Sequence, residues 1–87
     1  MTEKPISLGR NNMGKEQMTA EAYINRGVDK KNTGDYKGAI EDYNRAIKLN
    51  PKFALAYYNR GIAKGKLGDY EGADADFEKA IELKKAR

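Results

Sequence analysis

Apolar and small residues recur at a helical period over most of the chain. Between residues 36 and 49 they are separated by polar positions and comprise Tyr36, Ala39, Ile40, Tyr43, Ala46, Ile47 and Leu49. Spacings of three and four residues place such side chains on one face of an α-helix. The same period precedes Thr33-Gly34 and returns further along the chain. The sequence therefore predicts a first helix that ends before Thr33-Gly34, a second over 36–49, a third near 53–67 and a fourth near 70–85.

Turn and capping residues mark the boundaries between these helices. Gly34 or Asn32 can take the left-handed conformation that ends a helix, and Asp35 can accept hydrogen bonds from the first amides of the next one. Proline cannot continue a helix, so the second helix ends at Asn50-Pro51. Connections this short force consecutive helices to run antiparallel. We therefore expect two helical hairpins in tandem.

The beginning of the chain lacks this periodicity. Residues 1–14 mix proline, glycine and asparagine with scattered apolar residues, a composition typical of a flexible arm. From Lys15 onward nothing breaks a helix, so the first helix begins either at Lys15 or just after Thr19 as its N-cap. The predicted organisation is a flexible N-terminal arm over 1–14 and one helical domain over 15–87.

Residues 20–53 and 54–87 are two copies of one segment. The sequence AEAYINRG returns as ALAYYNRG, GDYKGA returns as GDYEGA, and 16 of the 34 aligned positions are identical. A repeat of this length indicates one supersecondary unit stacked on a copy of itself. Gly27 and Gly61 lie inside helices at the same repeat position, where glycine costs about 1 kcal/mol relative to alanine. We interpret them as points of close helix approach, and Tyr36 and Tyr70 as residues that fill the wedge between hairpins.

These residues give the chain a clear resemblance to the tetratricopeptide repeat (TPR) family. The family pattern has an aromatic residue early in the first helix of each repeat (helix A), then Gly, Gly-x-Tyr, Ala, an aromatic residue, Ala and Pro. The first repeat matches it with Tyr23, Gly27, Gly34, Tyr36, Ala39, Tyr43, Ala46 and Pro51. The second matches with Tyr57, Gly61, Gly68, Tyr70, Ala73, Phe77 and Ala80, and has Lys85 where proline would be.

The resemblance implies an all-α fold of antiparallel hairpins in a right-handed superhelix, with a concave face formed mainly by the A helices. It also implies a protein-interaction module. Some members bind carboxylate tails through Lys, Asn and Arg residues on successive A helices. This sequence matches that clamp poorly, because Asn59 fits it while Ile24 and Val28 occupy positions expected to hold Lys and Asn.

The family's groove positions, carried over to this chain, predict a largely apolar strip with two asparagines along it and two lysines at one end. We expect this strip to be exposed and to bind a peptide or helix of a partner protein. The predicted partner-binding residues are Ile24, Asn25, Val28, Lys31, Leu55, Tyr58, Asn59, Ile62 and Lys66.

The strip has two other possible occupants, the N-terminal arm around Ile6 and Leu8 or another copy of the chain. Repeat arrays generally need about three repeats and a polar capping helix, whereas this chain has two. The last helix is still apolar where a third repeat would dock. Two further hypotheses follow, self-association through that helix or through the concave face, and excision of this chain from a longer repeat array.

The amino-acid composition limits the kinds of functional site that the chain can form. The 87 residues include no cysteine and no histidine, which excludes disulfides and removes the commonest metal ligands. We expect no metal, no cofactor and no enzyme activity. The acidic residues that could act as acid and base lie at turns or on helix faces that we expect to be solvated. They are Asp35, Glu41, Asp42, Asp74 and Asp76, and the recurrence of Asp42 as Asp76 indicates a structural role.

Charge suggests one alternative function. The net charge is +4, and the lysines near the ends of the A helices (Lys30, Lys31, Lys64 and Lys66), with Tyr58 to stack on a base, could bind single-stranded RNA. Acidic residues interspersed among them make this the weaker hypothesis. The sequence contains neither a membrane-length apolar run nor a secretory signal, and we expect a cytoplasmic location without membrane contact.

Overall fold

The computed structural model describes residues 18–86, which form four α-helices and no strand. The helices are α2 (Ala20–Asn32), α3 (Tyr36–Leu49), α4 (Ala54–Lys66) and α5 (Tyr70–Lys85). The predicted all-α class and all three later helices are confirmed, while the predicted arm over 1–14 lies outside the described residues. No helix within residues 18–86 has both the length and the apolar character of a membrane span.

Capping side chains set the helix ends as predicted. The hydroxyl of Thr19 accepts a hydrogen bond from the amide of Ala22 at 3.0 Å, so α2 begins after Thr19. The carboxylate of Asp35 accepts from the amide of Gly38 at 2.9 Å, and Asp69 caps α5 in the same way. Gly34 has a φ of 89°, a left-handed conformation that glycine adopts without steric cost. These local interactions turn the chain back on itself within each repeat.

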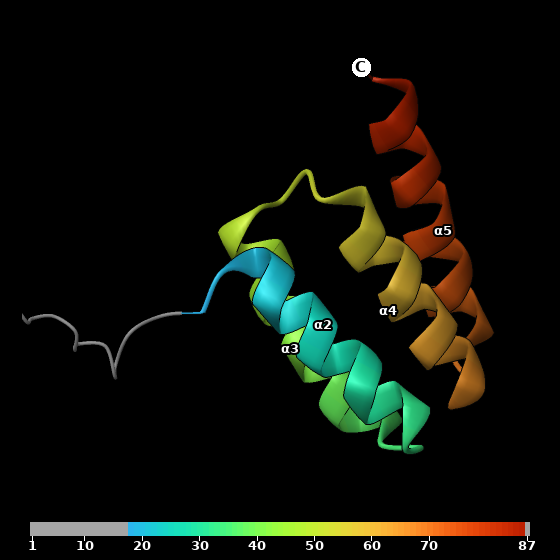
Figure 1. The fold of residues 1–87 in the computed structure, drawn as a ribbon. Helices are drawn as coiled ribbons and strands as arrows, with labels where there is room; N and C mark the ends of the chain where they lie inside the picture. The colour runs from blue at the N-terminus through green and yellow to red at the C-terminus, as the bar shows by residue number, and fades with distance from the viewer. Residues whose placement is uncertain (1–17, 87) are drawn as a thin grey trace, which may run out of the picture.

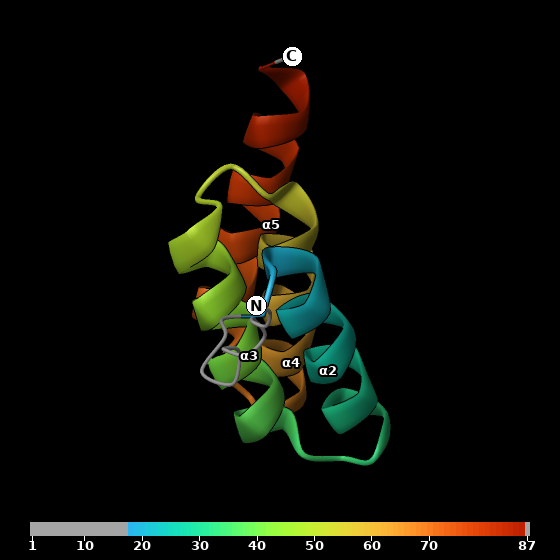
Figure 2. The same cartoon turned by 60° about the vertical axis from the view of Figure 1, so that its left-hand side comes forward.

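The four helices form two hairpins that lie side by side (Figures 1 and 2). Helix α2 packs along α3, α4 packs along α5, and α3 packs against α4 to join the two hairpins. Helix α5 is therefore an outer helix, with α4 on its inner side (Figure 1). The elements that end the array are α2 on one side and α5 on the other.

Close approach within each hairpin depends on glycine. A Cβ atom added at Gly27 would lie 2.6 Å from Cε1 of Tyr43, and one added at Gly61 would lie 2.7 Å from Cε1 of Phe77. Both distances are shorter than carbon atoms tolerate, so the aromatic ring of the second helix occupies the space that a side chain would need. The interpretation of these glycines as points of close approach is confirmed.

The buried apolar core joins three helices. It contains Ala20 and Ile24 of α2, Ala39, Tyr43 and Ala46 of α3, and Ala56 and Ala63 of α4. Helix α4 thus belongs to the second repeat in sequence, yet it closes the core of the first hairpin.

Candidate functional site

An apolar groove of about 520 Å³ runs between α4 and α5. Helix α4 contributes residues from its first turns, and α5 contributes residues from its middle to its last turn. The lining residues are Ala54, Leu55, Tyr58, Phe77, Ala80, Ile81 and Lys84. Lys84 is the one charged residue among them, so the groove offers mainly hydrocarbon and aromatic surface to a ligand.

Three large side chains of the groove are about half exposed. The exposed fractions are 50% for Leu55, 50% for Tyr58 and 55% for Ile81. The ring of Tyr58 is held against that of Phe77, with centroids 5.7 Å apart and planes inclined by 48°, an arrangement favourable for aromatic pairs. Because Phe77 itself packs against Gly61, the groove has a well-supported floor.

The groove is the uncovered counterpart of a buried contact in the first repeat. The residues 34 positions before Tyr58, Phe77 and Ala80 are Ile24, Tyr43 and Ala46. These three are at most 3% exposed and share a cluster with Ala56 and Ala63 of α4. In the second repeat no described helix occupies the corresponding place. The groove therefore exists because the surface that α4 covers in repeat one is left open in repeat two.

The structure brings only part of the predicted strip into this groove. Leu55 and Tyr58 line it, Asn25 and Lys66 are exposed elsewhere, and the remaining half-buried members are Val28, Lys31 and Ile62.

For two residues the expected exposure is wrong. Ile24 is 3% exposed because the hairpin core, closed by α4, surrounds it. Asn59 is 7% exposed, and its side-chain amide donates to the carbonyl of Leu55 at 3.1 Å. Both side chains are thus occupied within the chain, and the amide that matched the carboxylate clamp already has an internal partner.

The predicted partner-binding residues omitted the α5 side of the groove, although the last helix was predicted to be apolar where a further repeat would dock. Phe77, Ala80, Ile81 and Lys84 line it together with the A-helix residues. The signal for them was available, because Phe77, Ala80 and Ile81 repeat the apolar positions that pack between hairpins one repeat earlier.

The two tyrosines predicted to fill the wedge between hairpins differ in exposure. Tyr36 packs against the core as predicted, whereas Tyr70 is 70% exposed, so its predicted role as a wedge is wrong.

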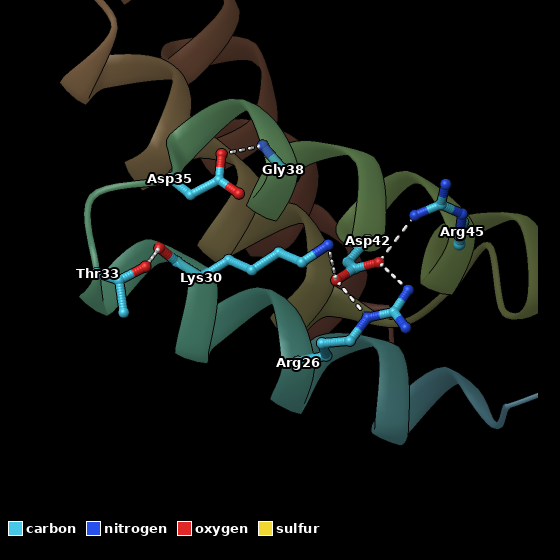
Figure 3. Close-up of polar contacts among 7 residues, drawn as sticks. All are labelled: Arg26, Lys30, Thr33, Asp35, Gly38, Asp42 and Arg45. Carbon is cyan, nitrogen blue, oxygen red and sulfur yellow. Dashed lines mark hydrogen bonds and ion pairs between the residues drawn. The ribbon is translucent and has the colours of Figure 1, made fainter.

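A buried ion cluster crosses each hairpin. In the first, the fully buried carboxylate of Asp42 accepts hydrogen bonds from Arg26 at 2.7 and 2.9 Å and from Arg45 at 2.8 Å, and Nζ of Lys30 lies 3.2 Å away (Figure 3). In the second, Asp76 pairs with Arg60 and Lys64 at 2.7 and 3.3 Å. Asp42 and Asp76 are therefore not solvated, which corrects the expectation, and their repetition has the structural role that the sequence indicated.

These contacts keep the two carboxylates ionised. Hydrogen bonding from Arg26, which outweighs the opposing effect of burial, lowers the pKa of Asp42 to about 2. Burial alone would raise the pKa of Asp76, but hydrogen bonds and charge from Arg60 and Lys64 bring it below its ordinary value. A carboxylate with so low a pKa and with its oxygens engaged is a weak proton acceptor at neutral pH. Within residues 18–86, no cluster of three or more acidic side chains could hold a metal ion.

The ion clusters also engage part of the predicted basic surface. Lys30 and Lys64, two of the four lysines considered for nucleic-acid binding, point their ammonium groups at Asp42 and Asp76. Arg26 and Arg60 additionally lie over the rings of Tyr23 and Tyr57, at 5.5 and 5.4 Å. These cations connect α2 to α3 and α4 to α5, so part of their charge is neutralised inside the protein.

Comparisons with known proteins agree with this architecture. A family described as "TPR repeat" matches residues 31–68, and one described as "Tetratricopeptide repeat" matches residues 54–85. A solved structure, the crystal structure of MamA, is 33% identical with a TM-score of 0.74, and the match covers 77% of this chain and 39% of the MamA chain. No curated protein matches the chain. The two matched segments overlap the hairpins, the ion clusters and the groove, and the chain belongs to the tetratricopeptide repeat family.

Proposed function

We propose that this chain is a protein-binding module that receives a helical or extended apolar segment of a partner in the groove between α4 and α5. The observation that carries this proposal is the exposure of Leu55, Tyr58 and Ile81 around the apolar groove. Exposed apolar surface of this kind marks interaction sites on soluble proteins. Membership in a family of protein-interaction repeats supports binding over catalysis.

The groove can supply a moderate affinity. Covering the exposed halves of three large apolar side chains contributes about 1 kcal/mol each, and the floor formed by Phe77 and Ala80 adds to this. Ordering the partner segment and losing its free motion oppose binding. We therefore expect a short segment to bind with modest affinity, and a partner that also contacts Asn25, Val28, Lys31, Ile62 or Lys66 to bind more tightly.

The test is a pull-down of partner proteins, carried out with the native chain and with the Tyr58→Glu variant. A carboxylate in the middle of the apolar groove is costly to bury, so we expect the Tyr58→Glu variant to retain none of the partners that bind the native chain there. Leu49→Glu is the matched control, because Leu49 is also 50% exposed but lies in the first hairpin, away from the groove. Retention of every partner by Tyr58→Glu, with normal folding by circular dichroism, would remove the binding site from the groove.

Single-stranded RNA binding remains the alternative, and no observation favours it. Two of the four lysines it relies on are paired with Asp42 and Asp76. A labelled oligonucleotide titrated at low salt provides the check, since binding through lysines weakens steeply as salt is added.

A further inference from the structure

We propose that the groove takes an α-helix whose contact face resembles that of α4, and that Glu78 selects a helix with an arginine or lysine in the middle of that face. This inference rests on the proposed function of the groove and specifies the partner. It comes from comparing the two repeats, because the protein shows in repeat one how the same surface is covered.

The cover in repeat one is a helix with small residues on its contact face. Ala56 and Ala63 of α4 are fully buried in one cluster with Tyr43 and Ala46 of α3. They lie seven residues apart, which is two helical turns on the same face. The corresponding surface of α5 keeps an aromatic ring and an alanine, Phe77 and Ala80. A helix that presents small residues at i and i+7 therefore fits this surface, whereas large side chains there would hold the helix axis away.

A polar contact beside this face gives the selection. Arg60 of α4 reaches across to α3, and its Nη1 donates to the side-chain oxygen of Asn44 at 2.8 Å. The residue 34 positions after Asn44 is Glu78, which is exposed on α5. A docked helix with arginine at the place of Arg60 would thus meet a carboxylate in place of a neutral amide. With a carboxylate in place of the amide, Coulombic attraction between opposite charges adds to the hydrogen bond, so Glu78 favours a cation at this position.

Helix α2 of a second copy is a poor occupant. Aligned with α4, it has Ala22 where α4 has Ala56, but Asp29 where α4 has Ala63. Ala63 is fully buried in the contact, so stacking one copy on the next in the same manner would bury the charge of Asp29 among apolar residues. Stacking of a second copy through α2 is therefore unfavourable, and the proposed occupant is a partner helix with small residues at i and i+7 and a cation between them.

The first experiment uses a fluorescent peptide with the sequence of residues 53–67 as the probe. Isolated helices of this length are marginal in water, so the peptide carries a crosslink on its outward face. We expect saturable binding to the full chain by fluorescence anisotropy, lost with Ile81→Asp in the chain. A control peptide with Ala63→Asp, which imitates α2, should bind at least about 10-fold more weakly. Equal binding of the two peptides, or no saturable binding of the first, would overturn the proposal.

The second experiment tests Glu78 by charge exchange. Glu78→Lys in the chain should weaken binding of the peptide about 5-fold, and Arg60→Glu in the peptide should restore most of that loss, as expected for a direct charge pair. Absence of restoration would overturn the role of Glu78. Because Glu78 is exposed, the variant chain is expected to fold normally, and circular dichroism checks this.

Two further measurements distinguish other occupants. A sedimentation mass of two chains that returns to one chain with Ile81→Asp would assign the groove to a second copy. Peptide binding that strengthens about 10-fold on removal of residues 1–17 would assign it to that segment. Either result would overturn the proposed occupant. If the peptide fails while Tyr58→Glu still abolishes partner capture, the proposed function stands and only the inferred helix face is wrong.

Discussion

In the first hairpin Ile24 is 3% exposed, and in the second its counterpart Tyr58 is 50% exposed. Ile47 is partly buried against the core, whereas Ile81, the same residue type at the same repeat position, is 55% exposed. The two hairpins have similar sequences and the same helix pairing, so the difference comes from the next element. Helix α4 covers one surface, and no described helix covers the other. Whether a repeat position belongs to the core thus depends on whether another helix packs over it.

The ion cluster of the first hairpin has more cations and a more buried carboxylate than that of the second. Asp42 has three cationic partners and is fully buried, while Asp76 has two and is 4% exposed. Lys79, which aligns with Arg45, pairs with Glu82 at 3.6 Å on the surface. The additional cation, Arg45, lies on α3 beside Asp42, so each carboxylate has two cations from the opposite helix of its hairpin. The first cluster is thus larger by one contact within α3, and the second hairpin carries the exposed groove.

The sharpest test of this comparison places the same charge at the same repeat position of each hairpin. Ile24→Glu puts a carboxylate into the closed core, and we expect a loss of at least about 3 kcal/mol in the free energy of unfolding. Tyr58→Glu changes a half-exposed residue and should cost no more than about 1 kcal/mol. Urea unfolding followed by circular dichroism measures both. Similar losses in the two variants would contradict the distinction between a covered and an open hairpin.

Removing one carboxylate at a time compares the ion clusters. Asp42→Asn leaves three cations without their shared anion, and we expect a loss of about 2–3 kcal/mol in the free energy of unfolding. Asp76→Asn, which leaves two, should cost about 1 kcal/mol less. Asp74→Asn serves as the control, because Asp74 is exposed on α5. Thermal unfolding of the four chains gives the order, and a larger loss for Asp76→Asn would reverse our ranking of the two ion clusters.

Lowering the pH should remove the stabilisation that the ionised carboxylate of Asp42 provides. The pKa of Asp42 is about 2 in the folded chain against an ordinary value of 3.8, so the unfolded chain takes up the proton first as the pH falls. The stabilising contribution is complete above about pH 4 and is lost between pH 4 and pH 2, by about 2 kcal/mol. Unfolding free energies measured across this range should fall more steeply for the native chain than for Asp42→Asn. Parallel slopes would contradict the pKa assigned to Asp42.

Local features of the fold were predictable because neighbouring residues determine them. Thr19, Asp35 and Gly34 act within a few residues of their own position, and each has the predicted role. The close approach at Gly27 was predictable as well, since glycine destabilises a helix interior and is best accounted for there by tight packing. The 34-residue period then gave the arrangement of hairpins.

The site was less predictable because burial there depends on packing between hairpins. A sequence shows that Ile24 and Tyr58 occupy one repeat position, but it does not show that α4 closes a core around only one of them. The burial of Asp42 has the same origin. Its partners Arg26 and Lys30 recur as Arg60 and Lys64, a signal for a repeated ion cluster that needs all three positions to be considered together.

The smallest expected effect concerns one hydroxyl group at equivalent core positions. Burial, with a smaller effect from the charge of Asp42, raises the pKa of Tyr43 to about 12, and its buried hydroxyl has no hydrogen-bond partner among the described residues. Repeat two has Phe77 at this position. Because an unsatisfied buried hydroxyl is unfavourable, we expect Tyr43→Phe to stabilise the chain by up to about 1 kcal/mol. Phe77→Tyr, at a partly exposed position where the hydroxyl can reach water, should change stability by less than about 0.5 kcal/mol. Chemical unfolding of both variants measures these changes, and a clear destabilisation by Tyr43→Phe would show that the hydroxyl has a partner, bringing the two positions closer in character than their burial indicates.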